Sequence, residues 1–448
     1  MANPHILFTS ADADRFELYQ SISPNYSHSF LFESLSGPGS LAEISIMGFD
    51  PKIVVSCYAD HMIMRNRDGT SQTIHTDDPL VEIRKLLADN TLQKQSNHRY
   101  LGGAVGVINY EAISLFGDVV SSHKNQEPLL EFGIYDDGII YDKKLDKPFY
   151  FYYSDNRFDK FKKTKSATTK FSVSDITPNM NKDTFEKMVT KAKDYIYAGD
   201  IFQVVLSRRH SFKVRGDHMQ VYDTMRRINP SPYMYHLKND SRTILGASPE
   251  MLVRITDDTV ETFPIAGTRA VTGDHITDES SANNMLHDEK ELAEHTMLVD
   301  LGRNDIGKVC KYGTVKIPSM MSIKKFSHVQ HMVTHVMGTI SSKFDMYDAF
   351  KSIFPAGTVS GSPKIRAMEI IDELEPQTRG PYAGAIGYFS YTGCCDFAIA
   401  IRSMFLNKDD GYVQAGAGIV SDSVPENEFQ ETINKVEAML QSLREASL

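Results

Sequence analysis

The chain has 448 residues, of which 41% are hydrophobic and 24% are charged, and its formal net charge is −10. This length predicts two or three domains, and the composition is ordinary for a soluble globular protein. The negative charge argues against nucleic acid or an anionic membrane surface as the main partner.

Cysteine usage and the first residues bear on the compartment. Cys57, Cys310, Cys394 and Cys395 form no CxxC pair, so we expect reduced thiols. The start, MANPHILFTSADADRF, lacks a basic segment followed by an apolar one, so no export signal is predicted. No run approaches the ~18 apolar residues of a membrane span. These features predict a cytoplasmic protein without a membrane partner.

Three regions follow one another along the chain. Residues 1–153 predict short strands and turns. Residues 154–178 are polar and rich in lysine, which we interpret as a linker or a solvated connection. In residues 179–448, helices and glycine-punctuated strands alternate irregularly. This order predicts an α+β fold rather than repeated βαβ units, and no internal repeat is visible.

The third region opens with a clear helix and a clear strand. In residues 185–199, apolar side chains recur on one helical face and Gly199 ends the run. Residues 201–214 then alternate as a strand, which puts Gln203 on the face opposite Val204.

Two predicted helices carry glutamates three residues apart. The pair is Glu291 and Glu294 in residues 287–305, and Glu428 and Glu431 in the helix that starts near Pro425. This spacing puts both carboxylates of a pair on one face, and two such pairs could converge on a hard cation such as Mg²⁺. Exposed helices are rich in glutamate, however, so the spacing alone favours solvent-facing residues.

The stretch FPAGTVSGSPKIRAMEIIDELEP joins a glycine-rich turn to a helix. A P-loop has four residues between its glycines and a lysine directly after the second. Here three residues separate Gly357 from Gly361, and Lys364 does not follow directly, so a nucleotide loop is excluded. Ser362 suits the N-cap and Pro363 the first helical position. Such a helix start could face a carboxylate or a phosphate, but the stretch alone favours an ordinary capped helix after a turn.

Two further motifs are incomplete. Residues 324–338 hold His328, His331 and His335, without the HExxH pattern of a zinc site. One of these histidines could serve as an acid or base near neutral pH. AGAGIVSDS, at residues 415–423, has a G-x-G without a third glycine, so a dinucleotide site is not predicted.

Nine segments together resemble the motif series of one family. They are GDIFQVVLSRR, GASPEMLVR, FPIAGTR, ELAEHTMLVDLGRNDIG, SHVQHMV, FPAGTVSGSPKIRAMEIIDELEP, GPYAGAIGY, AIRS and GAGIVSDSVPENEFQET. The series spans residues 199–435 and resembles the chorismate-utilising enzymes, most of all the anthranilate synthase component I group. SFLFESL and GFDP resemble the N-terminal region of that family. The resemblance implies a large sandwich of two antiparallel sheets flanked by helices.

The resemblance also implies a reaction. In this group, ammonia adds at C2 of chorismate as the C4 hydroxyl leaves, and pyruvate is then eliminated to give anthranilate, the first step of tryptophan biosynthesis. The reaction requires Mg²⁺, which would clamp and polarise the ring carboxylate. The matching positions are Glu250, His331, Thr268 and Gln203 for catalysis, Thr358, Tyr382, Arg402, Gly416, Ala417 and Gly418 for substrate, and Glu291, Glu294, Glu428 and Glu431 for the metal.

Some of these positions have defined roles in the family. Glu250 matches the general acid that protonates the departing C4 hydroxyl, and Thr268 lies in the motif lining that side. Arg402 and Tyr382 match the residues that hold the enolpyruvyl carboxylate. Thr358 matches a residue against the ring carboxylate.

Two positions separate the members of the family. Isochorismate and salicylate synthases carry a lysine at the position of Gln203, because they must activate water. Aminodeoxychorismate synthases, of the folate branch, typically carry a lysine at the position of Ala266. Both residues favour anthranilate synthase. The alternatives are aminodeoxychorismate synthase component I and a non-catalytic subunit that only binds chorismate or tryptophan.

The resemblance extends to a partner and to regulation. The chain lacks the cysteine elbow of a glutaminase, so we expect a separate glutamine amidotransferase subunit that supplies ammonia. A tryptophan feedback site is expected at Glu33, Ser34, Asn229, Pro230, Ser231, Pro232, Tyr233 and Met234. The chain departs from the family at residues 270–273, which we expect to form a surface loop.

Overall fold

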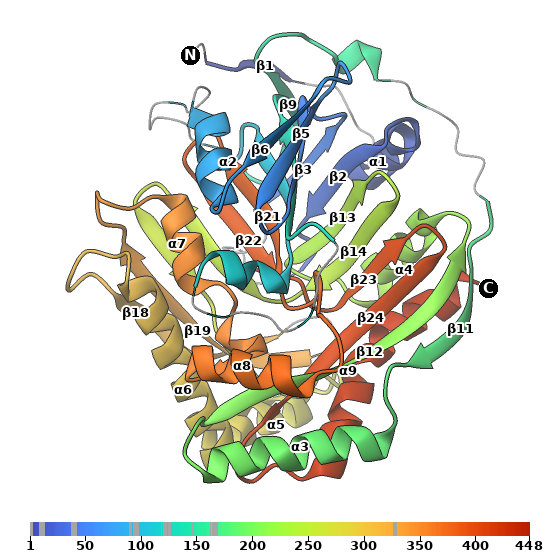
Figure 1. The fold of residues 1–448 in the computed structure, drawn as a ribbon. Coiled ribbons are helices and arrows are strands. Elements are labelled where there is room, and N and C mark those ends of the chain that lie inside the picture. The colour runs from blue at the N-terminus through green and yellow to red at the C-terminus, as the bar shows by residue number, and fades with distance from the viewer. Residues whose placement is uncertain are drawn as a thin grey trace.

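The structure is a computed structural model, and two large antiparallel sheets lie at its centre (Figure 1). It describes residues 3–8, 14–36, 43–88, 92, 98–117, 119, 123, 127–145, 147–161, 163, 169–325 and 329–448. The predicted α+β class with two antiparallel sheets is confirmed.

The first sheet has 12 strands in the described part of the chain. Its order is β1 (His5–Phe8), β10 (Phe149–Tyr152), β9 (Asp137–Asp142), β3 (Ile44–Phe49), β2 (His28–Glu33), β13 (Tyr233–Asn239), β14 (Arg242–Ser248), β23 (Ser403–Asn407), β24 (Asp410–Ile419), β12 (Gln203–Arg215) and β11 (Ser172–Pro178), with β20 (Gly361–Ser362) paired to β12.

The second sheet also has 12 strands among the described residues. Its order is β17 (Ile265–Ala270), β19 (Val329–Thr339), β16 (Thr259–Thr262), β15 (Met251–Thr256), β22 (Cys395–Ile399), β21 (Ala385–Ser390), β7 (Gly103–Ile108), β8 (Leu130–Tyr135), β4 (Ile53–Cys57), β5 (His61–Asn66) and β6 (Ser71–His75), with β18 (Lys316–Lys325) paired to β19.

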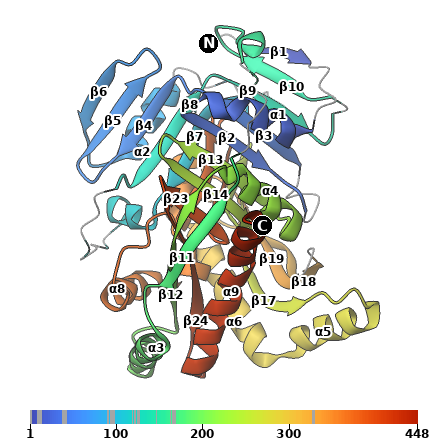
Figure 2. The same ribbon diagram turned by 90° about the vertical axis from the view of Figure 1, so that its right-hand side faces the viewer.

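Helices flank both sheets, as Figures 1 and 2 show. The α-helices are α1 (Arg15–Ile22), α2 (Pro79–Ala88), α3 (Lys182–Tyr197), α4 (His218–Ile228), α5 (His275–His287), α6 (Glu289–Gly307), α7 (Met346–Ile353), α8 (Lys364–Leu374) and α9 (Pro425–Ala446). Short 3₁₀ helices span Ser23–Asn25, Tyr110–Leu115, Phe158–Lys160 and Gly357–Val359.

Two cores hold these layers together. The larger core lies between the sheets and takes Phe30 from the first sheet and Phe389 from the second. The smaller core lies between the first sheet and helices α1, α4 and α9, with Tyr222 and Leu443 among its members. Burial of this apolar surface is the main force that joins the layers.

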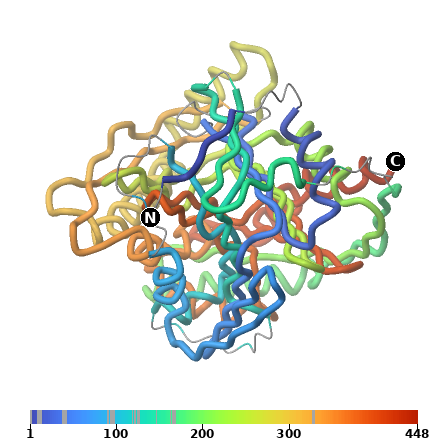
Figure 3. Tube along the Cα trace, turned by 90° about the horizontal axis from the view of Figure 1, so that it is seen from above, coloured from blue at the N-terminus to red at the C-terminus, as the bar shows by residue number. Residues whose placement is uncertain are grey.

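The sheets mix strands from both ends of the sequence. β2 and β3 pair beside β13, and β7 and β8 pair beside β21. Strands from residues 1–153 thus complete both sheets, and the boundaries at 153 and 178 stay a prediction. Seen from above, the N-terminal strand and the C-terminus lie apart (Figure 3).

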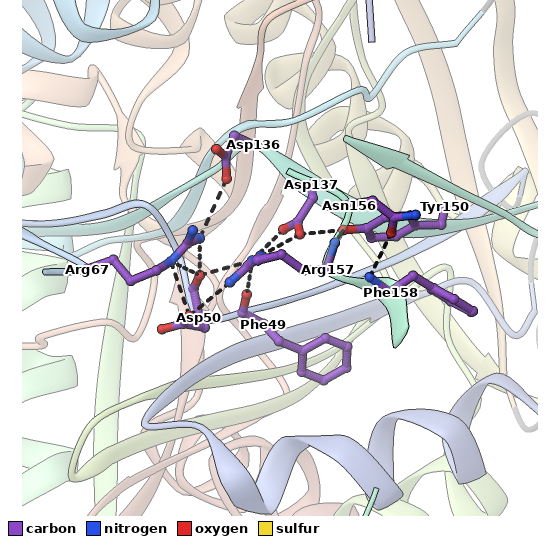
Figure 4. A network of polar contacts seen from close by, with 9 residues as sticks. All are labelled: Phe49, Asp50, Arg67, Asp136, Asp137, Tyr150, Asn156, Arg157 and Phe158. Atoms are coloured by element: carbon purple, nitrogen blue, oxygen red, sulfur yellow. Dashed lines mark hydrogen bonds and ion pairs between the residues drawn. The ribbon is translucent and has the colours of Figure 1, made fainter. Parts of the chain in front are cut away.

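Part of the expected connection 154–178 is fastened to the first sheet. Figure 4 shows Arg157 reaching three partners near the ends of β3 and β9. Its guanidinium lies 2.9 Å from the Asp50 carboxylate and 2.6 Å from that of Asp137, and it donates to the Phe49 carbonyl at 3.1 Å. These contacts fix the point where the chain leaves β10.

The helix and strand predicted in the third region are confirmed. Helix α3 ends at Tyr197, with Ala198 as its C-cap residue. Gly199 follows with φ +84°, a left-handed conformation suited to glycine. The strand predicted at 201–214 is β12, and the final helix begins at Pro425.

The predicted cap of α8 is wrong. Ser362 belongs to β20, where it pairs with Gln203, and Pro363 is the N-cap residue without a side-chain hydrogen bond. The backbone of the turn therefore completes a sheet edge, because Phe202 N–H donates to the Ser362 carbonyl at 2.7 Å. The histidine stretch is the strand β19, and His328 lies outside the described residues.

Residues 270–273 are mostly exposed, as expected of a surface loop. No helix in the described residues has an apolar stretch long enough to cross a membrane.

Candidate active site

The predicted site residues come from separate elements, and a chain of contacts links them. β12, β17, β19 and β24 contribute side chains or backbone, helices α6 and α9 contribute carboxylates, and three loops contribute Glu250, Tyr382 and Arg402. Their arrangement follows from strand pairing: β12 pairs with β24, and β17 pairs with β19.

Gln203 stands at the start of β12 and faces helix α6. Its Nε2 donates to Glu294 Oε1 at 2.9 Å, whereas its buried Oε1 has no hydrogen-bond partner among the described residues. Gly418 on the neighbouring strand allows this approach, since a Cβ there would lie 2.6 Å from Gln203 Nε2. A buried amide oxygen left unpaired is costly, so it suits a ligand that donates a hydrogen bond.

Glu250 lies in the turn between β14 and β15, with 6% of its surface exposed. Burial raises the pKa of its carboxyl to about 8, and the nearby Thr358 hydroxyl and Ile265 N–H offset only part of that rise. The Thr358 hydroxyl is itself buried and makes no hydrogen bond of ordinary geometry to a described residue. Glu250 therefore holds a proton at neutral pH, as a general acid must.

His331 points from β19 toward β17. Its Nδ1 lies 2.9 Å from the Gly267 carbonyl and 3.1 Å from Thr268 Oγ1. Burial lowers the pKa of His331 to about 4, so the ring is neutral at pH 7. Because a carbonyl oxygen only accepts, Nδ1 carries the ring proton and Nε2 is the basic nitrogen.

The predicted metal carboxylates on α6 and α9 lie near enough for their charges to influence one another. Burial raises the pKa of Glu294, and the charges of Glu291 and Glu431 raise it further. Burial likewise raises the pKa of Glu428, and Glu431 adds to the rise. Such repulsion between carboxylates is relieved by a cation.

The donor set suits a hard cation. Every candidate ligand is a carboxylate oxygen, which Mg²⁺ prefers. Among the described residues, no group of three or more Asp, Glu, His or Cys side chains is placed so that it could hold a metal ion by itself. Arg269 lies 3.0 Å from Glu291, and Lys435 lies 2.5 Å from Glu431. The residues therefore fit an ion that takes one or two carboxylates and fills its shell with water and substrate oxygens.

Arg402 and Tyr382 form the cationic side of the site. Arg402 Nη1 donates to the Lys435 carbonyl at 2.6 Å, and its backbone φ is +53°, a strained value for a residue other than glycine. Burial lowers its pKa, and no described carboxylate forms an ion pair with it. Burial raises the pKa of Tyr382 to about 12, so its hydroxyl stays protonated. A half-buried guanidinium that has no carboxylate partner and lies beside a hydroxyl can bind a carboxylate.

Comparison with known proteins agrees with this geometry. The profile of the family described as chorismate binding enzyme matches residues 28–441. The chain belongs to the chorismate binding enzymes. It is 43% identical to anthranilate synthase component 1 of Methanothermobacter thermautotrophicus over 431 residues, covering 96% of this chain and 92% of that protein. It is 40% identical to the Saccharolobus solfataricus protein of the same name, covering 95% of this chain and 96% of that protein.

Solved structures share the fold. The crystal structure of anthranilate synthase component I from Streptococcus pneumoniae superposes with a TM-score of 0.76 at 35% identity, covering 98% of this chain and all of that one (100%). The menaquinone-specific isochorismate synthase of Escherichia coli gives a TM-score of 0.76 at 18% identity, covering 99% of this chain and 95% of that one. That second likeness concerns the fold alone.

In this chorismate binding enzyme, one residue in the site was not predicted from sequence. Lys435 on α9 donates from Nζ to the Gly416 carbonyl at 2.9 Å and pairs with Glu431. Its charge also lowers the pKa values of Glu250 and Glu294. Lys435 follows Glu431 by four residues, so the helical spacing that groups Glu428 with Glu431 would also have indicated it.

A cavity lies between the two sheets, away from the candidate active site, and part of the expected tryptophan site lines it. The lining includes Glu33, Ser34, Pro232, Tyr233 and Met234. Asn229, Pro230 and Ser231 do not line it. Two of these brace the chain after β2 instead, as the Pro230 carbonyl accepts from Ser36 Oγ and the Ser231 carbonyl accepts from Leu35 N–H.

Polar residues from distant segments complete this cavity. Arg254 Nε donates to Asp396 at 2.8 Å, and the Tyr233 hydroxyl donates to the same carboxylate at 3.0 Å. Arg254 and Asp396 gave no sequence signal, because pairing of β15 with β22 alone brings them together. Glu33 borders the cavity, yet both of its carboxylate oxygens bind residues of α1 and α4.

Proposed function

We propose that the chain is the large subunit of an anthranilate synthase, converting chorismate and ammonia to anthranilate and pyruvate. Gln203 is the observation that carries this proposal. Its amide lies 2.9 Å from Glu294, at the position where water-activating relatives carry a lysine. An amide is not a base, whereas ammonia is nucleophilic without one. Ala266, in place of a lysine, supports the same reaction over aminodeoxychorismate synthesis.

Glu250 and His331 divide the proton transfers. The buried carboxyl of Glu250, with its pKa raised to about 8, donates a proton to the departing C4 hydroxyl. The neutral imidazole of His331, held by Gly267 through Nδ1, offers Nε2 as acceptor for the proton lost from C2 as pyruvate leaves. Their pKa values are pushed apart in opposite directions, as expected of an acid and base pair.

The two carboxylates of chorismate meet different groups. Arg402 and Tyr382 bind the enolpyruvyl carboxylate, since Tyr382 is buried, Arg402 is half-buried, and Arg402 pairs with no described acid. Thr358, Lys435 and the backbone of Gly416–Gly418 lie on the side of the ring carboxylate. Gly418 leaves the space beside Gln203 in which the nucleophile approaches C2.

Glu291, Glu294, Glu428 and Glu431 would hold Mg²⁺, which supplies charge to neutralise and polarise the ring carboxylate. The raised pKa values of Glu294 and Glu428 support this assignment, since burial is their main cause and repulsion by neighbouring glutamates adds to it, and a cation would offset both.

Ammonia comes from a separate glutamine amidotransferase subunit, and free ammonium replaces it in vitro. The name of the relatives, component 1, supports a second component. The chain functions in the cytoplasm, in keeping with Cys57, Cys310, Cys394 and Cys395, all of which are free thiols.

Tryptophan inhibits the enzyme from the cavity between the sheets. The cavity offers Asp396 for an ammonium group, Arg254 for a carboxylate and apolar walls such as Ile46 for an indole. Its lining combines β2 and β13 with β21 and β22, so a ligand there would couple the two sheets. Isothermal titration with tryptophan tests this, and an absence of heat would refute it.

A product assay decides the reaction. The purified chain is incubated with chorismate, Mg²⁺ and ammonium at alkaline pH, and products are identified by mass spectrometry and fluorescence. Anthranilate and pyruvate are expected. A 4-amino product that keeps the enolpyruvyl group would assign the enzyme to the folate branch, and binding without turnover would indicate a regulatory subunit.

A further inference from the structure

Arg208 is a buried arginine with unusual surroundings. It lies on β12 with 3% of its surface exposed. Its Nη1 donates to Thr432 Oγ1 at 3.1 Å and its Nη2 donates to the Met180 carbonyl at 3.2 Å. Its Nε has no hydrogen-bond partner, and no carboxylate in the described chain forms an ion pair with it. A buried charge without a countercharge is expensive.

Aromatic rings of two helices enclose this cation. The guanidinium carbon lies 4.1 Å from the centre of the Phe429 ring on α9 and 5.9 Å from that of Phe185 on α3. Cation–π contacts of this kind strengthen where water is excluded. Arg208 therefore joins β12 to α9 at two positions one turn apart, Phe429 and Thr432.

Helix geometry relates these two positions to the active site. Successive residues of an α-helix are rotated by about 100°, so the stripe of Phe429 and Thr432 lies next to the stripe of Glu428, Glu431 and Lys435. Fixing the first stripe against β12 sets the direction in which the second stripe points. The second stripe is the one that faces Gly416 and the carboxylates of α6.

Other contacts also hold α9, since Arg402 Nη1 donates to the Lys435 carbonyl and Lys435 Nζ donates to the Gly416 carbonyl, but among the described residues the first turn lacks a side-chain cap. The Val424 carbonyl accepts from Glu428 N–H at 3.1 Å, but the side chain of this N-cap residue cannot accept a hydrogen bond. Lys182 pairs with Glu426 at 2.6 Å, but both side chains are largely exposed, and such pairs contribute little. The contacts of Arg208 thus stand in place of a cap.

We propose that Arg208 is a positioning residue that fixes the rotation of α9, so that Glu428, Glu431 and Lys435 face Gly416 and the carboxylates of α6. Arg208 does not touch the reacting atoms, because it lies on the face of β12 opposite Gln203. The inference rests on the proposed function, since it concerns the carboxylates assigned there to Mg²⁺.

The test uses the full chain and the variant Arg208→Met, which keeps much of the length but removes the cation and the donors. Arg444→Met is the matched control, since Arg444 is an exposed arginine on the same helix, paired with Glu437. Binding of Mn²⁺ alone is measured by electron paramagnetic resonance, and hydrogen–deuterium exchange is followed across residues 425–436. We expect about tenfold weaker Mn²⁺ binding and faster exchange in Arg208→Met, with Arg444→Met unchanged.

Activity provides a further readout. The Mg²⁺ concentration for half-maximal rate should rise by about the same factor, with most of kcat recovered at saturating Mg²⁺. Arg208→Lys should give an intermediate result, because it keeps a cation near Phe429 but loses the planar fork. If Arg208→Met does not fold, Arg208→Lys and Phe429→Leu carry the test.

Several outcomes would overturn the proposal. Unchanged Mn²⁺ affinity and unchanged exchange of α9 would do so, even with a lower melting temperature, because the role would then be packing alone. A wild-type chain that binds no Mn²⁺ would also do so. These measurements need no chorismate, so they decide the role of Arg208 even if the wild-type chain produces no anthranilate and the proposed reaction fails.

Discussion

Glu33 and Glu250 are both buried glutamates, but the regions around them differ. Glu33, on β2, accepts hydrogen bonds from Arg15 Nε at 2.8 Å, Arg226 Nε at 2.8 Å and the Tyr222 hydroxyl at 3.0 Å. Glu250, in the turn between β14 and β15, lies near the Thr358 hydroxyl and the Ile265 N–H but forms no ion pair with a described residue. Burial raises its pKa to about 8.

The difference separates structural carboxylates from chemical ones. The Glu33 carboxylate accepts hydrogen bonds from two guanidinium groups and so fastens α1 and α4 to the sheet. A carboxyl without such partners keeps a proton, or repels its neighbours as Glu294 and Glu428 do. Removing charge should therefore destabilise the first region and disable the second without unfolding it.

The largest effect is expected for Glu250→Gln. The amide keeps the shape of the side chain but cannot donate a proton to the leaving hydroxyl. We expect kcat for anthranilate formation to fall by about 10²–10⁴-fold, with chorismate affinity little changed. Steady-state kinetics measure the first, and calorimetry the second. Glu261→Gln, on the neighbouring strand β16, is the control. A similar fall in kcat in the control would contradict the assignment of Glu250 as the general acid.

Glu33→Gln should act on stability instead. Two arginines would lose their shared partner, so we expect a loss of about 3 kcal/mol in the free energy of unfolding, measured by urea denaturation. Glu17→Gln, on the exposed side of α1, should change it by no more than about 0.5 kcal/mol. Wild-type stability in Glu33→Gln would contradict the contrast drawn between the two regions.

Loss of one metal carboxylate should have a smaller effect than loss of the acid. Glu428→Gln is expected to raise the Mg²⁺ concentration for half-maximal activity by about tenfold, since the amide offers a weaker oxygen ligand. Glu437→Gln, farther along α9 and exposed, should leave it unchanged. Equal Mg²⁺ dependence in both variants would show that Glu428 is not a ligand.

The pH profile of kcat/KM follows from the two shifted groups. His331, lowered to a pKa of about 4, must be neutral, so activity should fall as pH drops through about 4. Glu250, raised to a pKa of about 8, must be protonated, so activity should fall as pH rises through about 8. The residual rate of Glu250→Gln should not decline at alkaline pH. If the decline persisted in this variant, another group would be its cause.

The raised pKa of Glu250 also affects stability. Because the pKa is higher in the folded chain than the ordinary 4.5, the folded state is favoured below about 4.5 and loses stability as pH rises toward about 8. Glu250→Gln should therefore be more stable than wild type at pH 8. Thermal unfolding of both proteins at about pH 4.5 and at pH 8 measures this. A variant less stable than the wild type at pH 8 would show that nearby groups offset the cost of burying the ionised carboxyl.

The smallest effect is expected for Tyr233→Phe. Its hydroxyl links Asp396 to Arg254 in the cavity between the sheets. Without it, we expect tryptophan inhibition to weaken by about threefold to tenfold while kcat stays the same. Tyr195→Phe, on α3 and outside the cavity, should be inhibited by tryptophan to the same extent as the wild type. Identical inhibition constants for all three proteins would place the effector elsewhere.

Local spacing determined much of the secondary structure. Apolar periodicity indicated α3, β12 and α9, because one face of each packs against a core. The prediction of a helix cap failed at Ser362. The hydroxyl of Ser362 and the following proline suggested a cap, but Ser362 pairs with β12 and belongs to a sheet. Strand pairing with a distant segment is not visible in a local pattern.

The sequence by itself determined the order of the motifs and the class of the fold, and it predicted which side chains would carry the chemistry. Only the tertiary structure decided which glutamates are compensated, because Arg15 and Arg226 reach Glu33 from two different helices. It also brought Arg254 to Asp396 and Arg208 to α9. Charge, burial and distance between residues far apart in the chain depend on packing, and it is these quantities that set the pKa of Glu250 and the rotation of α9.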